Sequence, residues 1–241
     1  MHQLSDLPIE KSALGNLILG SKEFKTGGSA GSVTRKCQSS STVFNDRPLL
    51  VIDTPGWCDT QLSQEKVTNE LVRSFYEIAP GPHAFLIVTW GRHTTEAEDT
   101  LTVLEHLFGE SIVDYCIVVI THEDDLKYDG RTLEEYLAGS TTSFRSFIDR
   151  CGGRCIAVNS KTKNNDERTA KLTELLNYID SISEKQQKPF YTNELFEKAA
   201  QDEAQRRQNE EQRTRNELGE EDIRIQVSLN FKSFRRRFFN H

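Results

Sequence analysis

Leu49-Leu50-Val51-Ile52-Asp53-Thr54-Pro55-Gly56 decides the fold. Its first four residues form an uninterrupted apolar run, which is typical of a strand buried on both faces of a parallel sheet. Pro55-Gly56 then ends the strand and turns the chain outward. An acid such as Asp53, at the carboxyl end of a strand of this kind, stands where open α/β sheets bind their ligands. Taken alone, the stretch fits a phosphate-side switch and a plain strand end equally well.

Apolar strands and amphipathic helices alternate along the rest of the chain. Further buried strands are expected over 84–88, 115–120 and 154–158, and a short strand over 43–44 is joined to the first by a turn over 45–48. Helices are expected over 12–20, 64–78, 95–108, 133–149 and 169–182. This alternation predicts an α/β fold with a mostly parallel sheet that is covered by helices on both faces.

The composition limits the class of protein. The chain has 241 residues, of which 36% are hydrophobic and 28% charged, so it has room for one α/β domain and an appendage. Its net charge of −7 argues against a nucleic-acid-binding protein, whose domain is normally basic. No apolar run approaches the roughly 20 residues that span a bilayer. Residues 1–10 lack the basic and apolar regions of a signal peptide.

The cysteines indicate a reducing compartment. There are five of them, an odd number that does not suit a complete disulfide framework, so we expect a cytoplasmic location. Cys151 and Cys155 form the single close pair, and no second Cys/His pair completes a zinc site.

The character of the sequence changes after Lys188-Pro189. Residues 193–218 are almost all Ala, Glu, Gln, Arg, Lys and Asn, which predicts a solvated helix or a coiled-coil-like extension with few apolar seam positions. Residues 230–239 are both aromatic and basic. Such a tail can make peripheral contact with an anionic intracellular membrane, and a tail without structure is the alternative interpretation.

Lys11-Ser12 stands where a phosphate-binding loop would end. The P-loop pattern G-x-x-x-x-G-K-[ST] leads into a helix, its lysine reaching the phosphates and its hydroxyl holding Mg²⁺. Lys11-Ser12 precedes a predicted helix as the pattern requires, but the two glycine positions are Ser5 and Glu10. The carboxylate of Glu10 opposes phosphate binding, and the strand that should precede the loop is absent from the sequence.

Several motifs together resemble the immunity-associated nucleotide-binding GTPases, the IMAP family, which are relatives of septins and dynamins. The similarity covers roughly residues 11–182. The motifs are Ser12-Ala-Leu-Gly-Asn-Leu-Ile-Leu-Gly20, Ser29-Ala-Gly-Ser-Val-Thr34 with Cys37, Asp53-Thr-Pro-Gly56, Gly81-Pro-His-Ala-Phe-Leu-Ile-Val88, Gly91-Arg92-His93-Thr94 and Leu107-Phe-Gly109. The resemblance implies a P-loop GTPase-type G domain that lacks its first strand. It also implies GTP or GDP with Mg²⁺ as the ligand.

The resemblance assigns roles on the phosphate side of that site. Thr34 corresponds to the switch threonine that closes on Mg²⁺ and the γ-phosphate, and Lys25-Thr26 lies where the first switch begins. Asp53 is the metal-side acid and Gly56 the γ-phosphate sensor. The nucleotide-contacting residues implied here are Lys11, Ser12, Ala13, Thr26, Thr34, Asp53 and Gly56, with Ser12, Thr34 and Asp53 as the metal ligands.

On the base side, Thr121-His-Glu-Asp-Asp-Leu126 takes the place of the guanine-reading segment and includes His122. Asp125 would accept from N1–H and the exocyclic amine of guanine, which selects guanine over adenine. Asn159 corresponds to the last guanine-side loop, with Lys161 nearby, and Glu123 replaces a basic residue that the family often has. The alternatives are a helix cap for Asp125 and a turn residue for Asn159.

Hydrolysis is a separate question. Trp57 and Cys58 follow Gly56, so no side chain that would position water is evident there. The resemblance implies dimerisation through G domains, as a homo- or hetero-oligomer with related chains. Arg92 is then the candidate arginine that acts in trans on the transition state, and a surface arginine is its alternative interpretation.

Three hypotheses follow from the sequence. The first is a self-associating GTP-binding switch with slow or absent hydrolysis, and the second is a pseudo-GTPase that serves as an interaction module. In the third, residues 1–10 are an alternative start that replaces the first strand and the loop. The predicted divisions are an atypical N-terminus over 1–10, a G domain over 11–185 and a helical extension with its tail over 186–241.

Overall fold

The computed structural model describes residues 7–26, 36–55, 74, 78, 80–90, 94–194, 196–202 and 204–216. Most of the predicted helix over 64–78 and the tail over 230–239 therefore lie outside the described residues. Three of the predicted site residues, Thr34, Gly56 and Arg92, also lie outside them.

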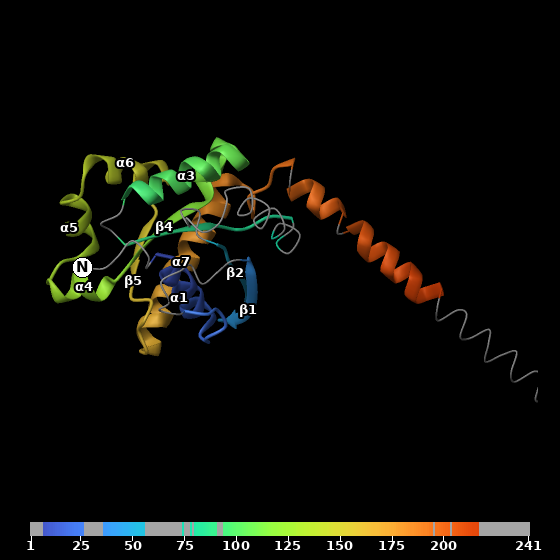
Figure 1. Ribbon diagram of the computed structural model, residues 1–241, viewed down its shortest axis with the longest axis horizontal. Helices are drawn as coiled ribbons and strands as arrows, with labels where there is room; N and C mark the ends of the chain where they lie inside the picture. The colour runs from blue at the N-terminus through green and yellow to red at the C-terminus, as the bar shows by residue number, and fades with distance from the viewer. Residues whose placement is uncertain are drawn as a thin grey trace, which may run out of the picture.

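Two sheets are formed by the described strands (Figure 1). β1 (Gln38–Phe44) and β2 (Arg47–Asp53) make an antiparallel hairpin, whose turn places Asn45 and Asp46 in the left-handed region with φ of 49° and 61°. Two consecutive left-handed residues match the right-handed twist of the strands that they join. β3 (Phe85–Thr89), β4 (Cys116–Thr121) and β5 (Cys155–Val158) form a parallel sheet in the order β3-β4-β5.

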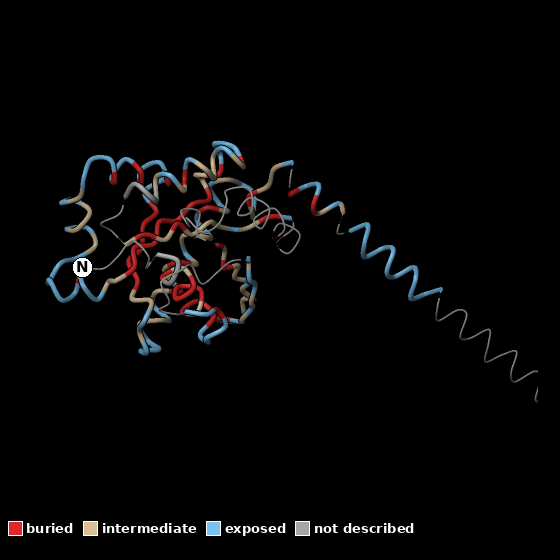
Figure 2. Tube along the Cα trace, in the orientation of Figure 1, coloured by how far each residue is buried: buried red, intermediate tan, exposed pale blue. Residues whose placement is uncertain are grey.

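Helices cover both sides of the parallel sheet, so the predicted α/β fold is confirmed. Figure 1 shows α3 and α6 on one side and α1 and α7 on the other. β4 and β5 are buried at every residue (Figure 2), as their continuous apolar sequences predict. The helices are α1 (Leu7–Leu19), α3 (Thr94–Phe108), the 3-10 helix η1 (Glu110–Tyr115), α4 (Glu123–Tyr128), α5 (Leu133–Ala138), α6 (Thr142–Arg150) and α7 (Asn165–Gln186).

Two helices differ from the sequence expectation. α1 begins at Leu7, so part of the predicted atypical N-terminus is helical. The helix expected over 133–149 is two helices, because Thr141 caps α6 by accepting from the Phe144 amide at 3.3 Å. Hydroxyl side chains bind free amides at helix starts and weaken helix interiors, which is why the chain breaks there.

The chain after α7 returns to the core. Tyr191 and Phe196 are fully buried beside Phe108, and the Tyr191 amide donates to the Pro82 carbonyl at 2.8 Å. Residues 204–216 are helical and exposed, and in Figure 1 this helix projects away from the body. It is therefore solvated as predicted, while a coiled coil stays a prediction. Within the described ranges, no helix is long and apolar enough to cross a membrane.

Gly81, four residues before β3, is a point of close approach to this C-terminal segment. A Cβ at Gly81 would lie 1.8 Å from the Tyr191 carbonyl oxygen, which is backbone and cannot step aside. We expect Gly81→Ala to destabilise the fold by about 2–4 kcal/mol in a urea titration, since such overpacking typically costs 1–3 kcal/mol or more. Gly139→Ala is the control, because its Cβ would meet nothing closer than 3.6 Å. Equal stability of the two variants would contradict the contact.

Candidate functional site

Ser12 and Asp53 come together where α1 crosses the carboxyl end of β2. The Ser12 hydroxyl donates to Oδ2 of Asp53 at 2.7 Å, and both residues are buried. Hydroxyl and carboxylate oxygens are ligands that Mg²⁺ accepts. The structure thus brings together two of the three predicted metal ligands, and the oxygen chemistry of the pair fits the metal. Lys11 precedes Ser12 and lines a cavity of about 920 Å³ that lies between β2 and β3. Ala13 follows Ser12 and is buried.

Asn16 holds the loop that follows α1. Its side-chain oxygen accepts from the amides of Glu23 and Phe24 at 2.9 and 2.8 Å, and its amide nitrogen donates to the Phe24 carbonyl at 2.8 Å. Phe24 is buried by this arrangement, whereas Lys25 and Thr26 are exposed. The structure therefore places Thr26 on the surface at the start of the predicted switch.

The predicted base-side residues follow β4 and β5. These two strands are parallel neighbours, so their carboxyl ends meet at one edge of the sheet. His122 precedes α4 in the left-handed conformation with φ of 64°, and Asp125 is exposed in the first turn of that helix. Beyond β5, Asn159 accepts from the Lys161 amide at 3.0 Å, which forms a tight turn. Asp125 thus lies at the start of a helix and Asn159 in a turn, as the alternative interpretations stated. These local structures do not decide whether the two residues contact a guanine base.

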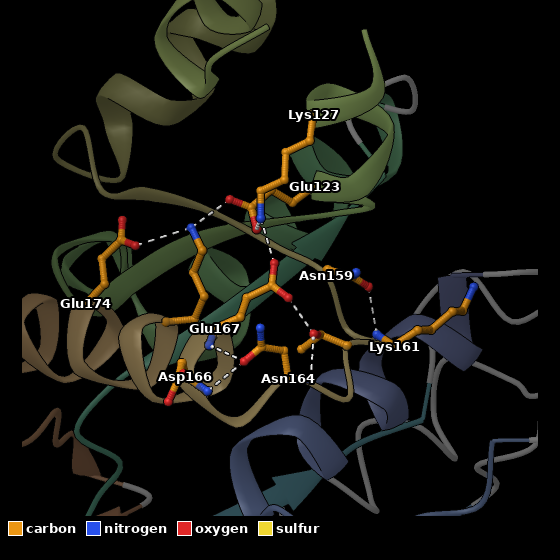
Figure 3. A network of polar contacts seen from close by, with 10 residues as sticks. Glu123, Lys127, Asn159, Lys161, Asn164, Asp166, Glu167 and Glu174 are labelled. Carbon is orange, nitrogen blue, oxygen red and sulfur yellow. Dashed lines mark hydrogen bonds and ion pairs between the residues drawn. The ribbon is translucent and has the colours of Figure 1, made fainter. Parts of the chain in front are cut away.

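Ion pairs connect α4 to the start of α7 and thereby support the base side (Figure 3). Lys127 binds Glu167 at 2.6 Å, and Lys171 binds Glu123 at 2.9 Å. Glu167 also accepts from the Thr162 hydroxyl. Lys127 and Thr162 both donate hydrogen bonds to Glu167, and these bonds lower the pKa of Glu167 below its usual range. The bond from Lys127 has the larger effect. Glu123, which stands where the family often has a basic residue, is therefore paired with Lys127 and Lys171.

Glu10 joins the first half of α1 to both base-side loops. Its carboxylate is buried and accepts from the Ser160 hydroxyl at 2.8 Å. It also lies 3.3 Å from Nε2 of His122 and 3.4 Å from Nζ of Lys161. A buried carboxylate needs such partners, because desolvation of an unpaired charge is costly. The sequence marks Glu10 as unfavourable for phosphate, but it does not reveal these partners, and Ser160 carried no signal of its own.

In the part of the chain that the structure describes, no group of three or more His, Cys, Asp or Glu residues could hold a metal ion by itself. Cys116, Cys151 and Cys155 are free, buried cysteines. Burial raises the pKa of Cys155 to about 12, so its thiol is protonated and unsuited to metal binding. The site near Ser12 and Asp53 therefore remains the candidate centre.

Comparison with models of protein families shows which family this chain belongs to. The family model described as "AIG1 family" matches residues 9–212, which is most of the chain. The chain belongs to the AIG1 family. The predicted resemblance to the immunity-associated nucleotide-binding GTPases is thereby confirmed, and residues 11–182 lie within the matched range.

Several curated relatives of this AIG1 chain are proteins of Arabidopsis thaliana. Immune-associated nucleotide-binding protein 10 is 35% identical over 205 residues, which cover 83% of this chain and 44% of the relative. Immune-associated nucleotide-binding protein 12 is 41% identical over 177 residues, covering 72% and 45%. The chain spans about half the length of these curated relatives.

Solved structures with a similar fold are GTPases. Toc33 from Arabidopsis thaliana, solved in complex with GDP and Mg²⁺, aligns with a TM-score of 0.52 at 14% identity, covering 75% of this chain and 81% of Toc33. A second structure comes from a study reporting that dimerization is important for the GTPase activity of the chloroplast translocon components atToc33 and psToc159. It aligns with a TM-score of 0.51 at 16% identity and covers 73% of this chain and 78% of that one. At these identities the likeness shows the fold, which is that of a G domain.

Proposed function

We propose that this AIG1 chain is a guanine-nucleotide-binding domain that takes GTP or GDP with Mg²⁺ and binds it weakly while Glu10 is in place. The family relationship and the names of the relatives support nucleotide binding, and the Toc33 complex supports GDP and Mg²⁺. The paired oxygens of Ser12 and Asp53 would hold the metal. Asp125 would select guanine, and Asn159 would support the base-side loop.

The carboxylate of Glu10 is the observation that carries the proposal. It occupies donors on both base-side loops, namely His122, Ser160 and Lys161, and it belongs to the helix turn that precedes Lys11. A bound nucleotide draws on the same end of the sheet and brings negative phosphates to it. Glu10 therefore acts as an internal anion that competes with the nucleotide.

A pseudo-GTPase that serves as an interaction module is the second candidate. The backbone over 7–10 favours it, because it is the first turn of a helix and not a glycine-rich loop whose successive amides surround a phosphate. In that case the domain keeps the fold, and Glu10 closes the site permanently.

Calorimetric titration with GDP and with GTPγS in Mg²⁺ distinguishes the two candidates. We expect guanine nucleotides to bind and ATP not to bind. Asp125→Ala should weaken GDP binding about ten- to hundredfold, because hydrogen bonds to a charged group contribute about 1.5–3 kcal/mol. Asp124→Ala removes a neighbouring exposed acid of the same helix turn and should leave the affinity unchanged. No heat and no thermal stabilisation at millimolar GDP would reject nucleotide binding and favour the pseudo-GTPase instead.

We also propose slow intrinsic hydrolysis that increases on self-association, with Arg92 acting on the partner's nucleotide. The importance of dimerization for the GTPase activity of atToc33 and psToc159 supports this expectation. Arg92→Ala should reduce concentration-dependent GTP turnover by about a thousandfold or more, as removal of an arginine finger does. Arg131→Ala, an exposed arginine paired with Asp129, is the control. Unchanged stimulated turnover in Arg92→Ala would reject the role.

A cytoplasmic location belongs to the same proposal. The free thiols of Cys116, Cys151 and Cys155 support a reducing compartment.

A further inference from the structure

α4 (Glu123–Tyr128) is a short helix that few apolar contacts hold in place. All six of its residues are described, and among them only Leu126 is buried. A helix of this length is not stable by itself in water, because nucleation costs more than one turn of hydrogen bonds returns. Contacts with the rest of the domain must therefore fix where α4 lies. The same helix carries Asp125, the residue proposed to bind guanine.

Two ion pairs join α4 to α7 (Figure 3). Lys171 binds Glu123 at the start of α4 at 2.9 Å, and Glu167 binds Lys127, one turn later in α4, at 2.6 Å. In each helix the two partners are four residues apart, so they lie on the same face. The acid precedes the base in both helices, so an antiparallel order of pairing brings each charge to its opposite. These four residues are called the clasp below.

Glu167 also binds the loop that follows β5. Its carboxylate accepts from the Thr162 hydroxyl as well as from Lys127, and its side chain is only 23% exposed. Within the loop, the Thr162 amide donates to the Asn159 carbonyl at 3.1 Å. One carboxylate therefore connects the helix that carries Asp125 to the loop that carries Asn159.

The charges of the clasp form a network. An isolated ion pair on a protein surface contributes little, because water screens it and two long side chains must be ordered for one contact. Here Glu123 lies 3.2 Å from Lys127 and 2.9 Å from Lys171, and Lys127 also binds Glu167. The hydrogen bond between Lys127 and Glu167 raises the pKa of the lysine and lowers that of the acid, so both are charged at neutral pH. The network therefore fixes α4 more firmly than one pair would.

We propose that the clasp holds Asp125 and the Asn159 loop in the relative positions that guanine requires, and thereby sets the preference for guanine over hypoxanthine. A carboxylate selects guanine when its two oxygens accept from N1–H and from the exocyclic amine together. Hydrogen bonds weaken steeply with distance and angle, so this double contact needs a fixed α4. Hypoxanthine has N1–H but no exocyclic amine, so it forms one of the two bonds.

The clasp residues are positioning residues, because they act through Asp125 and not on the base itself. This inference rests on the proposed function, since it needs a bound nucleotide. The quantity that reports it is the ratio of two affinities. A change that only destabilises the fold weakens both nucleotides equally, whereas a displaced Asp125 loses the nucleotide that makes the second hydrogen bond.

The test compares GDP with inosine diphosphate (IDP) by calorimetric titration of the full chain in Mg²⁺. The parent should bind GDP about tenfold more tightly than IDP or better, because IDP lacks one hydrogen bond to a charged group. Glu167→Ala should reduce this GDP-to-IDP ratio about three- to fivefold, since α4 and the loop lose their shared partner. Glu167→Gln keeps an acceptor for both donors and should lose less.

Asp166→Ala is the matched control for Glu167→Ala. It removes the neighbouring acid of the same helix turn, which is exposed and points away from α4 in Figure 3. The GDP-to-IDP ratio should stay at the parental value. Lys127→Met removes the other half of the pair from a side chain that is 55% exposed, so the variant should fold. It should lower the ratio as Glu167→Ala does.

A double variant shows whether Glu167 acts through Asp125. Asp125→Ala alone should abolish most of the preference for GDP. Adding Glu167→Ala to it should cause no further loss, because two residues that act through one contact are not additive. A parental ratio in both Glu167→Ala and Lys127→Met would overturn the inference, and so would an additive loss in the double variant.

The inference and the proposed function fail in different ways. A parent chain that binds neither GDP nor IDP would reject nucleotide binding, and the role of the clasp with it. A parent chain that binds both equally would reject the role of the clasp, because the site would have no guanine preference to set. A parent that prefers GDP, with clasp variants that keep the full preference, would reject the role of the clasp alone.

Discussion

Glu10→Ala is expected to raise the affinity for GDP and Mg²⁺ about ten- to hundredfold. The change frees the donors of His122, Ser160 and Lys161, which the buried carboxylate now occupies. It also removes a negative charge next to Lys11 in the chain. Each hydrogen bond that involves a charged group contributes about 1.5–3 kcal/mol, and 1.4 kcal/mol corresponds to a factor of ten in affinity. Calorimetric titration of the parent and the variant measures the difference.

The control for Glu10→Ala changes the same charge elsewhere on the chain. Glu23→Ala removes an exposed acid beyond α1 and should leave GDP affinity at the parental value. Circular dichroism confirms that both variants are folded. If a folded Glu10→Ala binds GDP no better than the parent, the carboxylate does not compete with nucleotide, and the helical backbone over 7–10 is the obstacle instead.

Arg168→Ala is expected to lower the free energy of unfolding by about 3 kcal/mol, which corresponds to a fall of about 6–12 °C in melting temperature. The guanidinium of this α7 residue donates to the carbonyls of Leu17 and Ile18 at 2.6 and 2.7 Å, at the carboxyl end of α1. It also lies over the ring of Phe44, 5.9 Å from its centre. One side chain thus joins α7, α1 and the β1–β2 hairpin, which borders the cavity.

Two further variants separate the contributions of Arg168. Arg168→Lys keeps a positive charge at the helix end but loses the planar fork, so about half of the effect should remain. Lys185→Ala removes an exposed cation from the last turn of α7 and should change stability by less than about 0.5 kcal/mol. Thermal unfolding followed by circular dichroism measures all three. An Arg168→Ala variant that melts within about 2 °C of the parent would show that the hairpin is held by other contacts.

The Arg168 contact also explains why Gly20 is glycine. Gly20 has φ of +75°, and a Cβ there would lie 2.8 Å from the guanidinium of Arg168. Glycine adopts this left-handed conformation without strain and leaves room for the arginine. The sequence predicted Gly20 as the residue that ends α1. The second requirement for glycine, room for the Arg168 side chain, depends on a residue that lies 148 positions later in the chain.

Local patterns in the sequence determined the element types. Continuous apolar runs predicted β3, β4 and β5, because a strand buried on both faces admits few polar residues. Motif order along the chain also identified the family, which the match over 9–212 confirmed. The prediction of one continuous helix over 133–149 was wrong, because the capping hydroxyl of Thr141 competes with helix propagation. Predictions of helix boundaries fail in this way because a single side-chain hydrogen bond can decide where a helix ends.

Tertiary structure alone decided which groups surround Glu10 and where a cavity lies between the two sheets. The partners of Glu10 come from loops about 110 and 150 residues away, and no local pattern reveals which donors a folded chain brings to a buried charge. The sequence predicted that the first strand of the G domain is missing, but only the packing of α1, α3 and α7 shows a cavity of about 920 Å³ between β2 and β3. Packing is a property of the assembled helices, and a cavity is present where their side chains do not fill the space between the two sheets.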